Sequence, residues 1–283
     1  MKTPGRRDAR GAARFPTISR PPCYRLTIEY DGTRYHGWQE QKNARTVAGE
    51  VRAAAEKVAG RVTDLGGSGR TDRGVHALAQ VAHLRTEKGV PPPRLKEGMN
   101  DLLPPDINLL SVDTAPARWH ARHDAAARAY LYQFSRRRTA FARKFVWWVQ
   151  APLDTALMRA AAAQLPGRHD FKRFCEAPAS QKSTIVVVEG VELVEAGDLI
   201  LLRLTASHFL WKMVRRLAGA LAKVGTGERK AGDIRALLEG KSDLNPAEWT
   251  APPSGLFLER VLYPGDAPLA PPVPAVPIAA ARG

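Results

Sequence analysis

The segment best suited to chemistry is GGSGRTDRGVHA, residues 66–77, in which Asp72 lies between Arg70 and Arg73 among four glycines. A neighbouring guanidinium favours the ionised carboxylate, so we expect a lowered pKa for Asp72. An ionised, partly enclosed carboxylate beside an arginine suits nucleophilic or electrostatic work on an electron-poor centre. Glycines would let the backbone bend so that Asp72 projects into a cleft. The alternative is a turn aspartate that caps its own backbone.

Two other kinds of site do not fit the sequence. A phosphate-binding P-loop needs glycine where Asp64 stands and lysine where Arg70 stands. His120 and His123 lie close together in RWHARHD, but a spaced third metal ligand is missing, as are Cys-x-x-Cys and His-Glu-x-x-His patterns. We therefore expect no metal ion and no nucleotide cofactor, and we assign these histidines ordinary polar or stacking roles.

The charge of the chain points to a polyanionic partner. The 283 residues include 43 Lys and Arg against 28 Asp and Glu, a net charge of +15. Nucleic acid is the first candidate for such a chain, and solvated arginine faces are the alternative. No apolar run reaches the roughly 18 residues that a membrane span needs. Two cysteines, Cys23 and Cys175, fit a reduced cytoplasmic protein without a disulfide framework.

A run of alternating basic and aromatic residues, 118–148, supports the nucleic-acid interpretation. Basic groups neutralise phosphates, and aromatic rings stack on unpaired bases. We include Arg122 and Arg128 of this run among the candidate RNA-binding residues. The alternative is a strand whose aromatic rings are core and whose arginines are solvated.

Hydrophobic periodicity predicts an α+β fold with a substantial antiparallel sheet. Strands are expected at 23–30, 75–84, 128–135, 184–207 with a turn near residue 197, and 255–263. Helices are expected at 46–60, 153–165, 209–225 and 231–240. Arg215 lies one position off the apolar stripe of the third helix, where its charge could point into a cleft.

The ends of the chain differ in composition from its middle. Residues 1–22 hold six basic residues and one acid and are expected to form a disordered basic arm, with an organellar presequence as the alternative. Residues 265–283 are proline-rich and are expected to be a disordered, unpacked tail. Between them we place an N-terminal half at 23–125, which carries the aspartate loop, and a C-terminal half at 126–264.

Eight segments in order resemble one known family, from about residue 23 to 264. GRTDRGVHA resembles the active-site motif of the TruA-type tRNA pseudouridine synthases. The other similar segments are LTIEYDGTRYHGWQEQ, RTVAGEV, LPPDI, WHARHDAAARAYLY, HDFKRF, FLWKMVRR and APPSGLFL. The resemblance implies two similar α/β halves around a long, mainly antiparallel sheet with a basic central cleft, usually in a homodimer. It also implies isomerisation of uridine to pseudouridine at positions 38 to 40 of the tRNA anticodon stem-loop, without a cofactor.

The same resemblance implies roles for individual residues. Asp72 matches the essential nucleophile or electrostatic partner, and Arg215 matches the arginine that pairs with it. Tyr130 matches the tyrosine that stacks on the target base, and Arg70 matches a residue that fills the gap left by a flipped uridine. Basic residues on the matching segments complete the candidate RNA-binding set, namely Arg73, Arg122, Arg128, Lys212 and Arg216.

Three other functions stay open at this point. The protein could modify another RNA, or it could be a noncatalytic RNA-binding module that helps tRNA to fold. A hydrolase acting at a nucleoside is the third, although that chemistry usually needs a second carboxylate within reach. The intact set of Asp72, Tyr130 and Arg215 favours the isomerase over a pure binding module.

Overall fold

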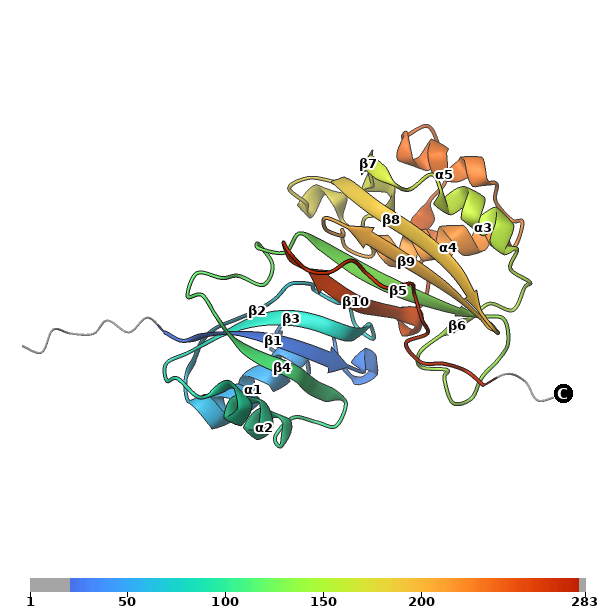
Figure 1. The fold of residues 1–283 in the computed structure, drawn as a ribbon. Helices are drawn as coiled ribbons and strands as arrows, with labels where there is room; N and C mark the ends of the chain where they lie inside the picture. The colour runs from blue at the N-terminus through green and yellow to red at the C-terminus, as the bar shows by residue number, and fades with distance from the viewer. Residues whose placement is uncertain (1–20, 280–283) are drawn as a thin grey trace, which may run out of the picture.

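A computed structural model describes residues 21–279, so the expected basic arm falls almost entirely outside the described residues. Within this range the chain forms a ten-stranded sheet and five α-helices (Figure 1). The strands are β1 Cys23–Tyr30, β2 Val62–Gly67, β3 His76–Thr86, β4 Ile107–Ala115, β5 Ala127–Ser135, β6 Trp147–Trp148, β7 Gly167–Asp170, β8 Ile185–Ala196, β9 Leu199–Ala206 and β10 Leu256–Leu262. The helices are α1 Val47–Ala59, α2 Pro92–Asn100, α3 Thr155–Ala162, α4 Met213–Gly225 and α5 Ala231–Leu238.

The expected strands and helices are all present, and the α+β class with a mainly antiparallel sheet is confirmed. Thr46 caps α1 as its residue type predicts, because its hydroxyl accepts from the Gly49 N–H. Five elements are not expected from the sequence, namely β2, α2, β4, β6 and β7. Gly66 and Gly67, expected in a loop, lie in β2 and pair with β3.

The last strand of the chain joins the two parts of the sheet. The strand order is β4-β1-β3-β10-β5-β9-β8-β7, with β2 paired to β3 and β6 paired to β5. β10 pairs in parallel with β3 and antiparallel with β5 (Figure 1). This insertion places the end of β2 and the start of β3 beside β5, although these strands are far apart in sequence.

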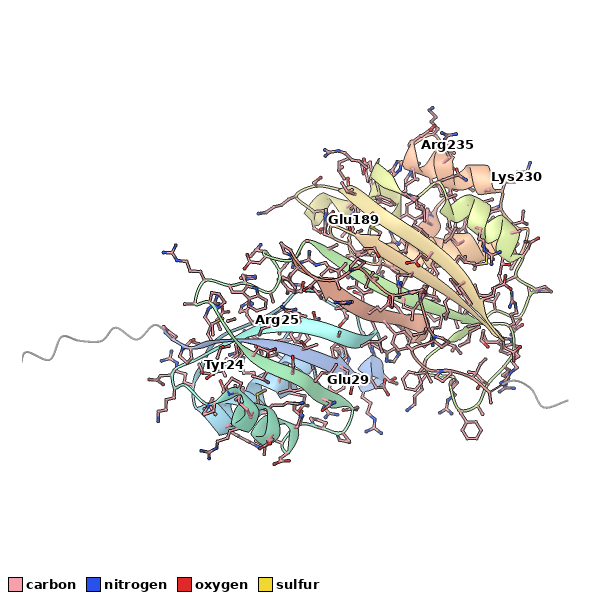
Figure 2. All side chains as sticks on the ribbon, viewed as in Figure 1. Tyr24, Arg25, Glu29, Glu189, Lys230 and Arg235 are labelled. Carbon is pink, nitrogen blue, oxygen red and sulfur yellow. The ribbon has the colours of Figure 1, made fainter. Side chains whose placement is uncertain are left out.

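All five helices pack against one face of the sheet. Alternate residues of β5, Tyr130, Tyr132 and Phe134, belong to one large core cluster that includes buried side chains from every helix. The side chains between them point to the other face, where Leu131 joins a smaller cluster with Phe257. Lys230, just before α5, and Arg235, on α5, extend away from the sheet (Figure 2).

The expectation of an unpacked C-terminal tail is wrong for residues 265–279. Val276 and Ile278 pack against the smaller cluster on the face without helices. The buried Gln133 accepts from the Ala275 N–H at 2.7 Å, and the buried Arg203 donates to the Ala270 carbonyl at 2.6 Å. The tail makes no regular structure of its own, but side chains of the sheet hydrogen-bond to three of its backbone groups, and it packs with apolar residues of β5, β9 and β10.

A close backbone contact fixes α4 against the turn that precedes β10. A Cβ built on Gly219 would lie 1.5 Å from the Trp249 carbonyl oxygen. One turn earlier in the helix, Arg215 and Ala251 exchange two hydrogen bonds: the Ala251 N–H donates to the Arg215 carbonyl, and the Arg215 Nε donates back to the Ala251 carbonyl. Only glycine permits this approach, which sets the position of the Arg215 side chain.

We predict that Gly219→Ala lowers the free energy of unfolding by about 2 kcal/mol or more, because the added methyl group forces the two backbones apart. Helix propensity alone would favour alanine by about 1 kcal/mol. The matched control is Gly232→Ala in α5, whose Cβ would meet nothing within 4 Å. Denaturant unfolding measures both variants; equal effects would contradict the contact.

Candidate active site

The loop between β2 and β3 carries Asp72, and the sheet holds it from one side. The side-chain amide of Gln80, buried in β3, accepts from the Gly69 N–H at 3.0 Å and donates to the Gly69 carbonyl at 2.8 Å. The hydroxyls of Tyr30 and Thr71 hydrogen-bond at 2.7 Å. These bonds fix the residues before Asp72 without using its carboxylate.

The segment after β1 holds the same loop from the other side. The Trp38 N–H donates to the Thr71 carbonyl at 3.1 Å, and a Cβ on Gly37, whose φ is +92°, would lie 2.4 Å from that carbonyl oxygen. A Cβ on Gly32 would lie 1.9 Å from the Val75 carbonyl oxygen. The close approach to this loop therefore depends on two glycines of another segment, Gly32 and Gly37. The sequence of the loop alone gives no sign of them.

Asp72 lies in a pocket of about 880 Å³ that is rich in cations. Six Lys and Arg residues line it, namely Arg70, Arg73, Arg122, Arg128, Lys212 and Arg215. Three histidines, His36, His123 and His208, line it as well. Among the described residues of the lining, Asp72 is the only carboxylate. The pocket thus combines one anionic group with a strongly positive wall.

Arg215 is the partner of Asp72. Its guanidinium lies 3.7 Å from the Asp72 carboxylate, and the two side chains are 15% and 22% exposed. Burial raises the pKa of Asp72, while the charges of Arg215 and Lys212 and a hydrogen bond from Trp211 act in the opposite direction. The expected lowering of the pKa by the flanking arginines is therefore wrong, because burial is the largest effect.

Tyr130 reaches the pocket from β5. Its ring meets Phe209 edge to face at a centroid distance of 5.0 Å. A Cβ on Gly69 would lie 3.2 Å from the Tyr130 hydroxyl, so glycine at this position makes room for the phenol. Burial raises the pKa of Tyr130, and the phenol is consequently neutral near pH 7.

The residues just before α4 form part of the pocket wall. The expected helix at 209–225 begins only at Met213, because Lys212 adopts a left-handed backbone with φ of +61°. Such a conformation costs about 1–3 kcal/mol for a residue other than glycine. Glu176 supports it: its N–H donates to the Trp211 carbonyl at 2.9 Å, and its carboxylate lies 3.1 Å from the Lys212 ammonium.

The structure places the predicted basic residues in three different situations. Arg70, Arg73 and Arg122 are exposed and line the pocket. Lys212 lines it while paired with Glu176. Arg128 touches the pocket but is buried, and its guanidinium donates to backbone carbonyls, including that of Arg122 at 2.6 Å.

Arg216 does not belong with these residues. It is absent from the described lining of the pocket, and its side chain is 6% exposed. Its guanidinium donates to the Cys175 carbonyl at 2.7 Å and forms an ion pair with Glu176. The helical periodicity explains the difference, because successive residues of α4 point about 100° apart.

Two aromatic residues of the pocket were not singled out from the sequence. Phe209 packs on Tyr130, and Trp211 is 49% exposed at the pocket. Both lie within the helix expected at 209–225, and neither belongs to its apolar stripe. The irregular backbone before Met213 turns them toward the pocket instead.

The structure also bears on membranes and metals. No helix within residues 21–279 is long and apolar enough to cross a membrane. In the same range, no group of three or more His, Cys, Asp and Glu side chains is arranged to hold a metal ion.

Comparison with known proteins gives consistent results over most of the chain. The family model described as tRNA pseudouridine synthase matches residues 26–124 and 161–264. Similar proteins named tRNA pseudouridine synthase A include one from Geobacter sp. (strain M21), 40% identical over 85% of this chain and 98% of that protein. Those from Caldicellulosiruptor bescii and Brucella ovis are each 39% identical, over 84% and 86% of this chain and 98% of each relative. The chain therefore belongs to the tRNA pseudouridine synthase family.

Proposed function

We propose that this protein isomerises uridine to pseudouridine in the anticodon stem-loop of tRNA, at positions 38 to 40, with Asp72 as the catalytic residue. The observation that carries the proposal is the pocket itself, in which one largely buried carboxylate faces a wall of six cationic side chains. Family membership supports tRNA as the substrate class.

The pocket suits RNA in its charge and in its exposed aromatic ring. Arg70, Arg73 and Arg122 offer exposed guanidinium groups to phosphates, and the half-exposed indole of Trp211 offers a face on which a base can stack. The target uridine must leave its stack before the reaction, at a cost of a few kcal/mol. Favourable phosphate contacts around the pocket offset that cost.

The reaction exchanges one bond for another within a single nucleotide. The N1–C1′ bond breaks, the uracil turns, and a C5–C1′ bond forms; C5 loses its proton and N1 gains one. Asp72 serves as the nucleophile or as the charge that stabilises the electron-poor centre. Hydrolysis of the nucleoside is disfavoured by this arrangement, because it usually needs two carboxylates and the described lining supplies one.

Arg215 and Tyr130 assist Asp72 in different ways. The Arg215 charge favours the ionised carboxylate against the effect of burial. The neutral phenol of Tyr130 stacks on the target base and directs its hydroxyl toward the loop that carries Asp72. We further infer that the protein acts in the cytoplasm and as a homodimer, the assembly that the family resemblance implies.

We predict that Asp72→Asn reduces turnover by about 10³-fold or more while tRNA binding is kept, because the amide cannot replace the carboxylate. The measurement is tritium release from tRNA labelled at uracil C5, together with the dissociation constant of the complex. Asp113→Asn, at an exposed carboxylate on the edge strand β4, is the matched control. Turnover near wild type in Asp72→Asn would rule out this assignment.

We predict that Arg215→Gln lowers the rate about 100-fold near pH 7 and moves the acid limb of the pH–rate profile to higher pH. The ionised form of Asp72 is active, its pKa is already raised by burial, and Arg215 is the largest influence that lowers it. Losing that charge raises the pKa further, so activity is lost earlier as pH falls. Initial rates across about pH 5–9 test this, and an unchanged acid limb would show that Arg215 acts otherwise.

A further inference from the structure

The loop between β4 and β5 places two side chains in the pocket. Arg122 and His123 both line it and both are exposed. Among the described residues neither side chain forms a hydrogen bond or an ion pair, and the His123 ring packs beside that of His120, so the direction of both side chains depends on the loop backbone. Hydrogen bonds from side chains of the loop itself and of neighbouring strands determine the conformation of that backbone.

His120 closes the turn that presents these residues. Its Nδ1 accepts from the Arg122 N–H at 3.1 Å and from the His123 N–H at 3.3 Å. The backbone N–H of His120 donates to the Asp124 carboxylate at 2.9 Å. A ring nitrogen that accepts two hydrogen bonds carries no proton, so this turn requires Nδ1 to be unprotonated.

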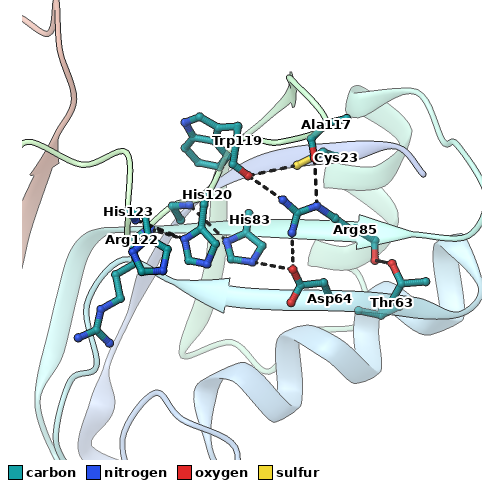
Figure 3. A network of polar contacts seen from close by, with 12 residues as sticks. Cys23, Thr63, Asp64, His83, Arg85, Ala117, Trp119, His120, Arg122 and His123 are labelled. Atoms are coloured by element: carbon teal, nitrogen blue, oxygen red, sulfur yellow. Dashed lines mark hydrogen bonds and ion pairs between the residues drawn. The ribbon is translucent and has the colours of Figure 1, made fainter. Parts of the chain in front are cut away.

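His83, buried in β3, supports the same turn from behind. Its Nδ1 accepts from the Ala121 N–H at 3.3 Å, which leaves Nε2 to donate to the Asp64 carboxylate at 3.1 Å. Figure 3 shows the imidazoles of His83, His120 and His123 side by side. Their ring centroids are 4.3 and 4.2 Å apart along this series.

The surroundings keep both supporting rings neutral. Burial lowers the pKa of His120, and the neighbouring His123 adds to the effect. Burial likewise lowers the pKa of His83. The titratable groups that face His120 are Asp64 on β2, Arg85 and His83 on β3, and His123 and Asp124 within its own loop.

A metal site is not the explanation for this cluster. The Nδ1 atoms of His83 and His120 are both occupied by backbone N–H groups. The described residues contain no group of three or more ligands arranged around one metal position. The cluster therefore acts through the backbone that it holds.

We propose that His120, supported by His83, is a positioning residue for RNA binding, and that its neutral imidazole holds the loop so that Arg122 and His123 face the tRNA. This inference rests on the proposed function, in that tRNA is the ligand. His120 itself need not touch the RNA; it acts through the two backbone N–H groups that it accepts.

Other contacts keep the rest of the loop in place when His120 is changed. The Arg128 guanidinium donates to the Arg122 carbonyl, and the Tyr263 hydroxyl donates to the Ala121 carbonyl at 2.7 Å. Arg85 donates to the Trp119 carbonyl at 2.9 Å. Loss of the His120 acceptor is thus expected to make the backbone at Arg122 and His123 more mobile while the fold remains.

The test compares full-length wild type with His120→Ala and His120→Asn in binding to unmodified tRNA and in tritium release. We expect His120→Ala to raise the dissociation constant and KM about tenfold, with kcat within about twofold. The reason is that the misplaced Arg122 loses roughly one charge-assisted contact to the RNA. His120→Asn should restore both values, because the asparagine oxygen can accept from the N–H two residues on. His169→Ala is the control, at a histidine on β7 that bonds within its own turn.

Long-range ¹⁵N NMR of the imidazoles supplies a second measurement that does not depend on turnover. We expect His120 to show an unprotonated Nδ1 at pH 7 and to titrate below the usual value of 6.5. A protonated Nδ1 at pH 7 would overturn the proposal. So would wild-type affinity in His120→Ala, or an equal loss of affinity in His120→Ala and His120→Asn.

These readouts separate this inference from the proposed function. If wild type binds tRNA but releases no tritium, the proposed reaction fails while the binding and NMR measurements still decide the role of His120. If tritium is released and His120→Ala binds normally, the positioning role fails and the reaction stands.

Discussion

The ion pair between Asp72 and Arg215 is the interaction around which this molecule is arranged. One partner lies on the loop between β2 and β3, and the other lies in the first turn of α4, more than a hundred residues later. Burial of the carboxylate works against its charge, and the arginine works for it. The pair therefore forms only when both parts of the sheet are held side by side, which the insertion of β10 between β3 and β5 provides.

Close backbone approaches hold the two partners at this distance. Gly32 and Gly37 allow the segment after β1 to touch the loop that carries Asp72, and Gly219 allows α4 to touch the turn before β10. Lys212 has an unfavourable left-handed backbone conformation, and α4 begins directly after it at Met213, which leaves Arg215 at the pocket. Fixed side chains and backbone at such a site reduce the reorganisation that the reaction requires.

The arginines in and near the pocket are of two kinds, which differ in burial and in hydrogen bonding. Exposed guanidinium groups such as Arg70 and Arg122 are available to phosphates, whereas the buried groups of Arg128 and Arg216 hold backbone carbonyls. Burial lowers the pKa of His83 and of His120 and so keeps both imidazoles neutral. Their Nδ1 atoms can therefore accept hydrogen bonds from backbone N–H groups within this cationic region. Net charge alone does not distinguish these arginines, whereas burial separates the exposed from the buried ones.

The sequence by itself determined the strands β1, β3, β5, β8, β9 and β10 and four of the helices, because alternation and helical periodicity are properties of neighbouring residues. The local sequence singled out Asp72, whereas the roles of Tyr130 and Arg215 came from the resemblance to one family, and all three roles stay predictions. The division of the chain at residue 125 stays a prediction. Only the tertiary structure decided that the pKa of Asp72 is raised, that Arg216 is turned away from the pocket, that residues 265–279 pack on the sheet, and that His120 accepts from two backbone N–H groups beside the pocket. Each of these depends on burial or on contacts between segments distant in the chain, and such contacts leave no periodic signal in the sequence.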